Sequence, residues 1–405
     1  MRIAILTNEY PPHIYGGAGV HVEYLTRELT RIERGNEVQV LCFGDQRVDQ
    51  GNLSVQGFEA PFKVIGQDSR HNKFFDTLAR NLVQAGALDQ VDIVHCHTWY
   101  THFAGCLAKQ LTGAKLVLTT HSLEPHRPWK VEQLGSAYHA STWVERTAYE
   151  NADGVIAVSN AMREDVHTLY GVPTPKIKVI HNGIDLDQYR PTFDPDVLRK
   201  YAVDPARPYI LFVGRITRQK GIIHLVEAIR HLKSELQVVL CAGAPDTPEI
   251  GDEMVKKVEQ ARTQTRNQII WIPQVVPKDE IVTLYSGASL FVCPSVYEPF
   301  GIINLEAMAC GTPVVASAVG GIKEVVLPGV TGSLVDIEPG ENGDFEPRDP
   351  ALFARSLAAA IDELLSDPAR LASMGKRSRE RVEAEFGWPS IARFTLDFYR
   401  ELLET

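Results

Sequence analysis

Residues 290–317, LFVCPSVYEPFGIINLEAMACGTPVVAS, contain a short apolar run, a loop, an apolar helical segment and a second short apolar run. The runs at 290–295 and 312–317 have the length and composition of buried strands, and 303–309 is predicted to be the helix between them. A strand, a helix and a strand in this order are typical of a parallel sheet covered by helices. The stretch therefore predicts an α/β fold.

The same alternation extends on both sides of this stretch. Runs rich in valine and isoleucine recur before it, from RIAILTN to KIKVIHNG and again from YILFVGR to QIIWIPQ, with amphipathic segments between them. This alternation is interrupted at 183–208, a segment that is rich in prolines and charged residues and has no long apolar run. We therefore predict two doubly wound α/β domains, 1–190 and 191–387, followed by an amphipathic helix at 388–405.

Composition excludes several classes of protein. The 405 residues carry a net charge of −10, which argues against general affinity for nucleic acid or anionic lipid. The chain shows no export signal and no apolar run of about 20 residues, so a membrane span is not expected. Its six cysteines are scattered singly without a C-x-x-C spacing, which favours a reduced cytoplasmic location and no zinc.

Ligands of open α/β sheets bind beyond the carboxyl ends of the strands, so the loops after the apolar runs should carry the chemistry. After the first run, Gly16 and Gly17 precede a helix, where they either admit a phosphate or only form a tight turn. The segment FVGRITRQKG begins at the end of the run YILFV and places Arg215, Arg218 and Lys220 close together in a chain that is acidic as a whole. This cluster is either a solvated loop or, as we favour, an anion site.

The loop of the opening stretch combines Glu298, Gly301 and Glu306. Backbone amides of PFGI at the start of a helix suit a phosphate, and a carboxylate inside that helix can accept hydrogen bonds from ribose hydroxyls. The alternative is that the two glutamates form a glycosidase pair. We disfavour it, because nothing in the spacing forces their carboxyls to the separation of about 5–9.5 Å that hydrolases use.

VDIVHCHTWYTHFAG places His95 and His97 on one face of a strand, with Trp99 and Tyr100 at its exit. Two histidines on one face can ligate a metal, but hydrogen-bonded core histidines are commoner, so no metal is expected. The two aromatic residues are predicted to form a platform for a sugar ring.

Two further segments leave alternatives open. Segment 118–133, LTTHSLEPHRPWKVEQ, is either an ordinary loop or an acceptor pocket with basic anchors. Its candidate polar and aromatic residues are His121, Glu124, Arg127, Trp129 and Lys130. Asp185 and Asp187 form a D-x-D, which in some transferases holds a metal bound to a nucleotide diphosphate. Their position in the predicted linker favours a turn instead.

The order of Gly16 and Gly17, HCHTW, His121, FVGR with Lys220, and EPFGIINLEAMACGTPVVAS resembles the large retaining glycosyltransferase family that includes bacterial glycogen and starch synthases. The resemblance covers nearly the whole chain. It implies the GT-B fold, in which two Rossmann-like domains face each other across a cleft. The first would bind the acceptor, the second would bind the nucleotide sugar, and the helix from Trp388 would cross back to the first.

The resemblance also implies roles for individual residues. Arg215 and Lys220 match the pair that binds the donor pyrophosphate, and Glu298 and His121 match residues around the transferred glucose. These four are the candidate catalytic residues. Gly16 and Gly17 match glycines near the distal phosphate. The remaining donor-binding candidates, Glu306 for the ribose and a run of backbone amide donors for the phosphate, are Phe300, Gly301, Ile302, Ile303 and Glu306.

HTWYTHFAG and HSLEPHRPWKVEQLG most resemble the short branch of this family that makes maltose 1-phosphate from ADP-glucose. The implied reaction is α-1,4-glucosyl transfer, with glucose 1-phosphate or an α-glucan end as acceptor in glycogen synthesis, without a cofactor. Longer glycogen synthases have KTGGL and HDW where this chain has IYGGA and HTW, so the resemblance specifies the donor more closely than the acceptor. The candidate acceptor residues are Tyr15, Trp99, Tyr100, Arg127 and Lys130.

Other activities remain as alternatives: a synthase restricted to glucan acceptors, a transferase for another nucleotide sugar, an epimerase or a glycosidase. A non-enzymatic binding protein is disfavoured, because a site without catalysis has no reason to retain Arg215, Lys220, Glu298 and Glu306 together. The sequence leaves open whether the chain forms a homo-oligomer.

Overall fold

A computed structural model describes residues 1–14, 16–341 and 345–404. The chain divides into two compact units. The first comprises Met1–Gly183 with Trp388–Thr405, and the second comprises Ile184–Gly387. The division thus falls before residue 184, where the sequence placed it at 190. None of the described helices is both long enough and apolar enough to cross a membrane.

The first unit is built on one sheet in the order β3-β4-β2-β1-β5-β6-β7-β8. All neighbouring strands in it are parallel except β3, which runs antiparallel to β4. The strands are β1 (Arg2–Leu6), β2 (Glu37–Phe43), β3 (Arg47–Gln50), β4 (Leu53–Phe58), β5 (Ile93–His97), β6 (Lys115–Thr120), β7 (Gly154–Ala157) and β8 (Ile177–Val179). Strands β5 and β7 are buried throughout, as expected for a sheet with both faces covered.

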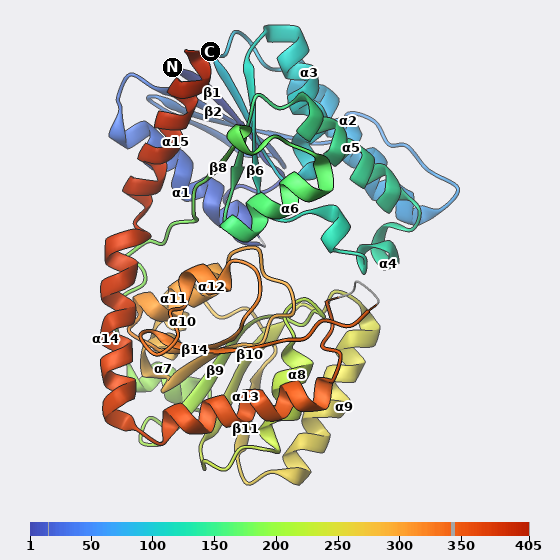
Figure 1. The fold of residues 1–405 in the computed structure, drawn as a ribbon. Helices are drawn as coiled ribbons and strands as arrows, with labels where there is room; N and C mark the ends of the chain where they lie inside the picture. Colours follow the sequence, from blue (N-terminus) through green and yellow to red (C-terminus); the bar gives the residue numbers. More distant parts are fainter. Residues whose placement is uncertain (15, 342–344, 405) are drawn as a thin grey trace. The chain divides into compact units, whose positions relative to one another are not determined.

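Helices cover both faces of this sheet (Figure 1). On one face lie α1 (Gly17–Ile32) and α15 (Trp388–Leu403), and on the other α2 (Asn72–Gly86), α3 (His102–Thr112) and α5 (Ala137–Asn151). The shorter elements are α4 (Lys130–Leu134), α6 (Asn160–Tyr170) and the 3₁₀ turns η1 (Ser69–His71), η2 (Trp99–Thr101), η3 (Glu124–His126) and η4 (Thr174–Lys176). Helix α15 is the helix predicted at 388–405, and its Trp388 stacks on Tyr24 of α1 with ring centroids 5.6 Å apart.

The sheet of the second unit is entirely parallel, in the order β11-β10-β9-β12-β13-β14. Its strands are β9 (Tyr209–Arg215), β10 (Gln237–Gly243), β11 (Gln268–Ile272), β12 (Leu290–Cys293), β13 (Val314–Ser317) and β14 (Gly332–Val335). After β9 the chain adds β10 and β11 on one side of it, and it then adds β12, β13 and β14 on the other side. The strand order therefore reverses between β9 and β12, which is where doubly wound sheets bind ligands.

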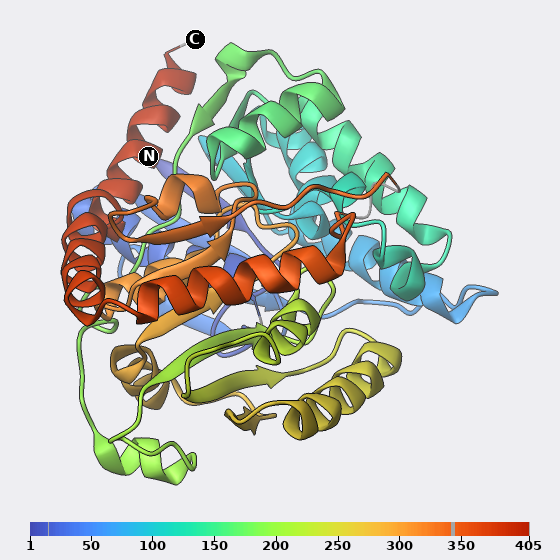
Figure 2. The ribbon, with the colours of Figure 1, turned by 60° about the horizontal axis from the view of Figure 1, so that its bottom comes forward.

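Helices α8 (Ile222–Ile229), α9 (Pro248–Gln264) and α13 (Pro350–Leu365) cover one face of the second sheet and come forward in Figure 2. The other face carries α10 (Lys278–Gly287), α11 (Ile302–Ala309) and α14 (Pro368–Glu385). Two short helices are α7 (Pro195–Lys200), within the predicted linker, and α12 (Ile322–Val325).

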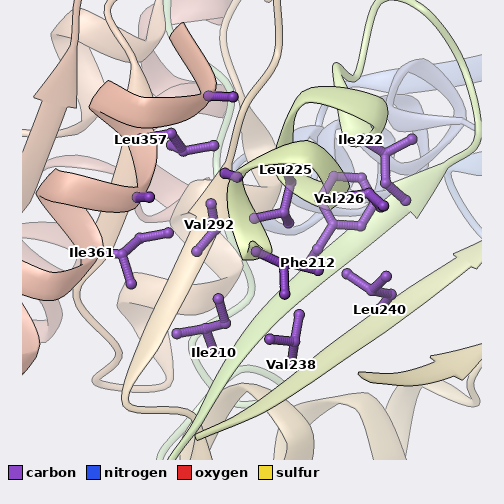
Figure 3. Close-up of a cluster of buried hydrophobic side chains, with 14 of the residues drawn as sticks. Ile210, Phe212, Ile222, Leu225, Val226, Val238, Leu240, Val292, Leu357 and Ile361 are labelled. Carbon is purple, nitrogen blue, oxygen red and sulfur yellow. The ribbon is translucent and has the colours of Figure 1, made fainter. Parts of the chain in front are cut away.

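Figure 3 shows the core between the first of these layers and the sheet, where Phe212 of β9 and Leu240 of β10 lie on the side of Leu225 of α8, and Leu357 of α13 lies on the side of Val292 of β12. This packing holds the strands in register, and so fixes the positions of the loops that follow them.

Candidate active site

Two loops meet where the strand order of the second unit reverses. Lys220 lies in the loop after β9 and Glu298 in the loop after β12, and Lys220 Nζ is 2.6 Å from Glu298 Oε2. Both side chains are mostly buried, at 19% and 9% exposed, and Ser295 Oγ donates a second hydrogen bond to Glu298 Oε2 at 3.3 Å. The two predicted residues are therefore brought into direct contact by neighbouring strands of the sheet.

Glycines make this close approach of the loops feasible. Gly221 has φ +61°, and a Cβ built on it would lie 2.0 Å from the carbonyl oxygen of Pro294. Gly320 has φ +47°, and its Cβ would lie 2.0 Å from the carbonyl oxygen of Glu298. The next amide, that of Gly321, donates to the same oxygen at 3.1 Å. Any larger residue at either glycine would push the backbone around Glu298 out of place.

Arg215 at the end of β9 and Arg218 in the loop after it are both paired with acids. Arg215 Nη1 forms an ion pair with Asp246 Oδ1, and the amide of Asp246 donates to the carbonyl oxygen of Ile216 at 3.2 Å. Arg218 Nη2 lies 3.7 Å from Glu253 Oε2 at the surface. Asp246 was not predicted from the sequence, although it lies three residues after the end of β10, in the kind of loop where ligands of such sheets bind.

Glu306 on α11 accepts two hydroxyl hydrogen bonds. Tyr189 Oη donates to its Oε1 at 3.1 Å, and Tyr285 Oη donates to its Oε2 at 2.7 Å. Burial raises the pKa of Glu306 above its ordinary value, while the two hydroxyl donors act in the opposite direction. Neither tyrosine was predicted. Tyr189 comes from the linker and Tyr285 from α10, and neither position carries a motif.

The start of α11 has the features of an anion site. Gly301 precedes the helix with φ +98°, Phe300 is buried, and Ile302 and Ile303 are partly exposed. The first turn contains no acidic side chain, so no carboxylate within that turn offsets the positive end of the helix dipole. These are the residues that the sequence predicted as donors to a phosphate.

In the linker, Asp185 Oδ1 accepts hydrogen bonds from the amides of Asp187 and Gln188 at 2.9 and 3.0 Å. The prediction that the D-x-D forms a turn is confirmed.

Histidines gather at the carboxyl ends of β5 and β6 in the first unit. His97 Nδ1 lies 2.9 Å from Nε2 of His121, which follows β6, and His21 Nδ1 lies 2.7 Å from Asn182 Oδ1. One nitrogen from each of the three histidines lies within 4.8 Å of the others, a spacing that could also hold a metal ion. Burial lowers the pKa of His21 to about 4, and burial and neighbouring imidazoles lower the pKa values of His97 and His121 well below the ordinary range.

His95 is a core residue of the kind expected. Its Nδ1 lies 2.5 Å from Tyr399 Oη on α15, and its Nε2 lies 2.6 Å from Thr119 Oγ1 on β6. Both ring nitrogens are used, and burial is the main cause that lowers the pKa of His95 to about 3.

The glycine turn after β1 meets a carboxylate. The amide of Gly16 donates to Glu9 Oε2 at 2.9 Å, and α1 begins at Gly17. A Cβ on Gly19 would lie 2.8 Å from Glu9 Cβ, so glycine is needed for this close approach. Tyr15, the third residue predicted in this turn, lies outside the described residues.

The predicted aromatic platform is only partly exposed. Trp99 is 3% exposed and stacks on Tyr100 and Phe74, with ring centroids 4.4 and 6.0 Å apart. Tyr100 is half-buried and carries Lys130 Nζ 5.3 Å from its ring centroid. Trp99 thus supports Tyr100 from the core.

The two predicted basic anchors converge on a buried acid. Lys130 Nζ lies 3.2 Å and Arg127 Nη1 3.7 Å from Glu124 Oε1, and the Glu124 side chain is 1% exposed. The Arg127 side chain is 19% exposed and that of Lys130 is 5% exposed. A second buried acid, Glu145, accepts a hydrogen bond from the Glu124 amide at 2.9 Å and was not predicted.

Comparisons with known proteins agree with this architecture. Residues 15–188 match the family described as Glycosyltransferase Family 4, and residues 194–381 match Glycosyl transferases group 1. An alpha-maltose-1-phosphate synthase of Mycolicibacterium smegmatis is 45% identical over 410 residues, which cover 99% of this chain and 100% of that one. The chain belongs to this glycosyltransferase family.

More distant relatives fit the same family. This glycosyltransferase is 29% identical over 420 residues to a glycogen synthase of Mycobacterium tuberculosis, covering 98% and 94% of the two chains. Among solved structures, a sucrose-phosphate synthase from Thermosynechococcus elongatus superposes with a TM-score of 0.76 at 27% identity, covering 100% and 99% of the two chains. The predicted fold class, GT-B with two Rossmann-like units, is confirmed.

Proposed function

We propose that this glycosyltransferase moves glucose from ADP-glucose to glucose 1-phosphate with retention of configuration, forming maltose 1-phosphate. The observation that carries the proposal is the full-length similarity to alpha-maltose-1-phosphate synthases, at 45% and 47% identity. The glycogen synthase of Mycobacterium tuberculosis is 29% identical. An α-glucan end is therefore the second candidate acceptor.

The loops of the second unit suit the donor. When the bond between the sugar and the diphosphate breaks, negative charge develops on the phosphate oxygens, and preorganised cations and amides lower the barrier. Lys220, Arg215 and the first amides of α11 are the groups we assign to this charge. Glu306, which already accepts two tyrosine hydroxyls, is assigned to the ribose hydroxyls.

The environment of Glu298 argues against a double displacement. A carboxylate nucleophile must approach the sugar carbon with its charge available, but Glu298 is 2.6 Å from the Lys220 ammonium and also accepts from Ser295. We therefore assign Glu298 to binding the sugar hydroxyls. The acceptor hydroxyl forms the new bond to the sugar carbon on the face from which the diphosphate departs, and its proton goes to the departing phosphate oxygen.

On the acceptor side, Arg127 is the anchor we assign to the phosphate of glucose 1-phosphate, because its side chain is the more exposed of the two basic residues beside Glu124. Lys130 would then serve chiefly to neutralise Glu124. Since the cationic groups assigned to the diphosphate come from the chain itself, we propose that no metal or other cofactor takes part.

The test incubates the purified protein with ADP-glucose and either glucose 1-phosphate or a maltooligosaccharide, and follows ADP release and product mass. A disaccharide phosphate from the first mixture, undiminished by a chelator, supports the proposal. Elongation of the oligosaccharide alone would make the protein a glucan-extending synthase, and free glucose as the main product would make it a hydrolase.

A further inference from the structure

The hydrogen bond between His97 and His121 links a residue assigned to the reaction to one without an assignment. His97 lies at the end of β5 and is fully buried, and His121 is partly exposed just beyond β6. The bond joins His97 Nδ1 to His121 Nε2 at 2.9 Å. One of the two nitrogens carries the hydrogen and the other accepts it.

The surroundings of the other ring nitrogen of His97, Nε2, decide which of the two histidines donates this hydrogen bond. Within the described part of the chain, no hydrogen-bond partner reaches the buried His97 Nε2. If His121 donated, a neutral His97 would have to carry its hydrogen on Nε2, leaving an N–H donor buried without an acceptor. If His97 donates from Nδ1, only a bare lone pair is left there. Orphaned buried N–H groups are the rarer and more costly of the two.

We propose that His97 is a positioning residue that holds His121 as the tautomer protonated on Nδ1. The proposal rests on the proposed function only in that His121, which the resemblance matches to a residue around the transferred glucose, contacts that sugar. Because His97 Nδ1–H occupies His121 Nε2, a neutral His121 carries its one hydrogen on Nδ1. His121 then offers the substrate a hydrogen-bond donor and has no free nitrogen to act as a base.

The surroundings keep both rings neutral, as this arrangement requires. Among the described residues, the titratable groups that act on His121 are imidazoles: His97 and His95 on β5, and His21 on α1, whose ring centroid is 4.7 Å from that of His121. His102 on α3 acts on His97 in the same way. Burial disfavours protonation of any one of these imidazoles to the charged form. Once one ring is charged, it repels a positive charge on a neighbouring ring. His95 cannot supply a hydrogen to His97 Nε2 without giving up its bonds to Tyr399 or Thr119.

The direct test is nitrogen NMR of the wild-type protein labelled at histidine, with the His121 signals assigned by comparison with His121→Gln. The expected result at neutral pH is a protonated, pyrrole-type Nδ1 and a bare, pyridine-type Nε2 on His121. The reverse pattern, or an imidazolium, overturns the proposal. This measurement needs neither a substrate nor a folded variant of His97.

Substitutions of His97 then connect the tautomer to the reaction. In His97→Asn the side-chain amide places an N–H near the original Nδ1, so we expect kcat within about threefold of wild type. In His97→Asp an ionised carboxylate can only accept, so a neutral His121 carries its hydrogen on Nε2. A catalytic histidine held in the wrong tautomer can lower kcat by several orders of magnitude, so we expect kcat to fall by about 10² or more. We also expect a new ionisation in the pH profile of kcat. His97→Gln, in which the N–H lies one bond further out, is the matched control and should not retain the activity of the Asn variant.

Failure of the glucosyltransferase activity and failure of the His97 positioning role would give different experimental results. A wild-type protein without activity on ADP-glucose would refute the proposed function and leave the NMR result standing. An Nδ1-protonated His121 together with equal kcat in the Asn and Asp variants would refute the positioning role and leave the proposed function standing.

Discussion

Lys220 Nζ and Glu298 Oε2 lie 2.6 Å apart and join the loop after β9 to the loop after β12. The contact places a cation and an anion at the point where the strand order reverses, with each orienting the other. Because Lys220 is only 19% exposed, its charge acts in a medium that screens less than bulk water. A diphosphate that binds here must share this ammonium with Glu298.

Lys220→Ala should lower kcat for glucosyl transfer by about 10² to 10³, the range seen when one preorganised group that stabilises developing charge is removed. Steady-state kinetics with ADP-glucose and glucose 1-phosphate measure the effect. Lys200→Ala is the matched control, since Lys200 forms an ion pair with Glu280 at the same 2.6 Å but lies at the surface. A loss below about threefold for Lys220→Ala would remove Lys220 from the catalytic assignment.

Glu306→Gln should weaken ADP binding by about 1.5 to 3 kcal/mol, roughly a 10- to 150-fold rise in Kd, because a hydrogen bond to a charged group is replaced by one to a neutral group. Calorimetric titration with ADP measures it. Tyr189→Phe, which removes one donor to Glu306 and keeps the carboxylate, should change Kd less. An unchanged Kd in Glu306→Gln would mean that the carboxylate serves only to hold Tyr189 and Tyr285.

Gly320→Ala should reduce both stability and activity, because the new Cβ would meet the Glu298 carbonyl at 2.0 Å and displace the loop that carries Glu298. Gly329→Ala separates this clash from backbone strain, since Gly329 has φ +76° but nothing within 4 Å of its Cβ. We expect Gly329→Ala to lose about 1 kcal/mol of unfolding free energy with kcat retained, and Gly320→Ala to lose clearly more of both. Denaturant unfolding and steady-state kinetics compare the pair, and equal losses would contradict this account.

The fold and the principal loops of the site could be predicted because they follow from periodic patterns. Runs of valine and isoleucine mark parallel strands, and parallel strands carry their following loops to one edge of the sheet. Lys220 and Glu298 could therefore be placed at the same edge, 78 positions apart in the chain. The helix predicted at 303–309 begins one residue earlier, at Ile302.

Pairings between side chains could not be predicted in the same way. Tyr285 reaches Glu306 because α10 packs beside α11, and nothing in the local sequence of α10 specifies that contact. Lys130 stands in a basic segment that suits a phosphate, yet its ammonium lies against Glu124. Such partners depend on which helix faces which, and this is set by packing over the whole unit.

Glu145→Gln should remove a pH dependence of stability that the wild type shows. Burial, with a further contribution from Glu124, raises the pKa of Glu145 to about 8, whereas an unfolded chain has a glutamate pKa of about 4.3. Between these values the native state binds a proton that the unfolded state releases, so stability contributed at low pH is lost as the pH rises. The loss relative to the variant should be on the order of a few kcal/mol between pH 5 and pH 8.

The pH dependence of the unfolding free energy must be compared between the wild type and the variant, because buried histidines lower stability as the pH falls, whereas Glu145 lowers it as the pH rises. Burial lowers the pKa values of His95 and His102 to about 3, so the stability they allow is lost as the pH falls below their unfolded pKa of about 6.5. Glu150→Gln, at an exposed position of the same helix α5, is the control and should follow the wild-type curve. Because the glutamine side chain in Glu145→Gln would keep a carbonyl oxygen to accept from Tyr170 and from the Glu124 amide, the variant should fold. If the unfolding free energies of the wild type and Glu145→Gln ran parallel from pH 5 to pH 8, Glu145 would have to be ionised in the native protein, with Lys130 balancing both acids.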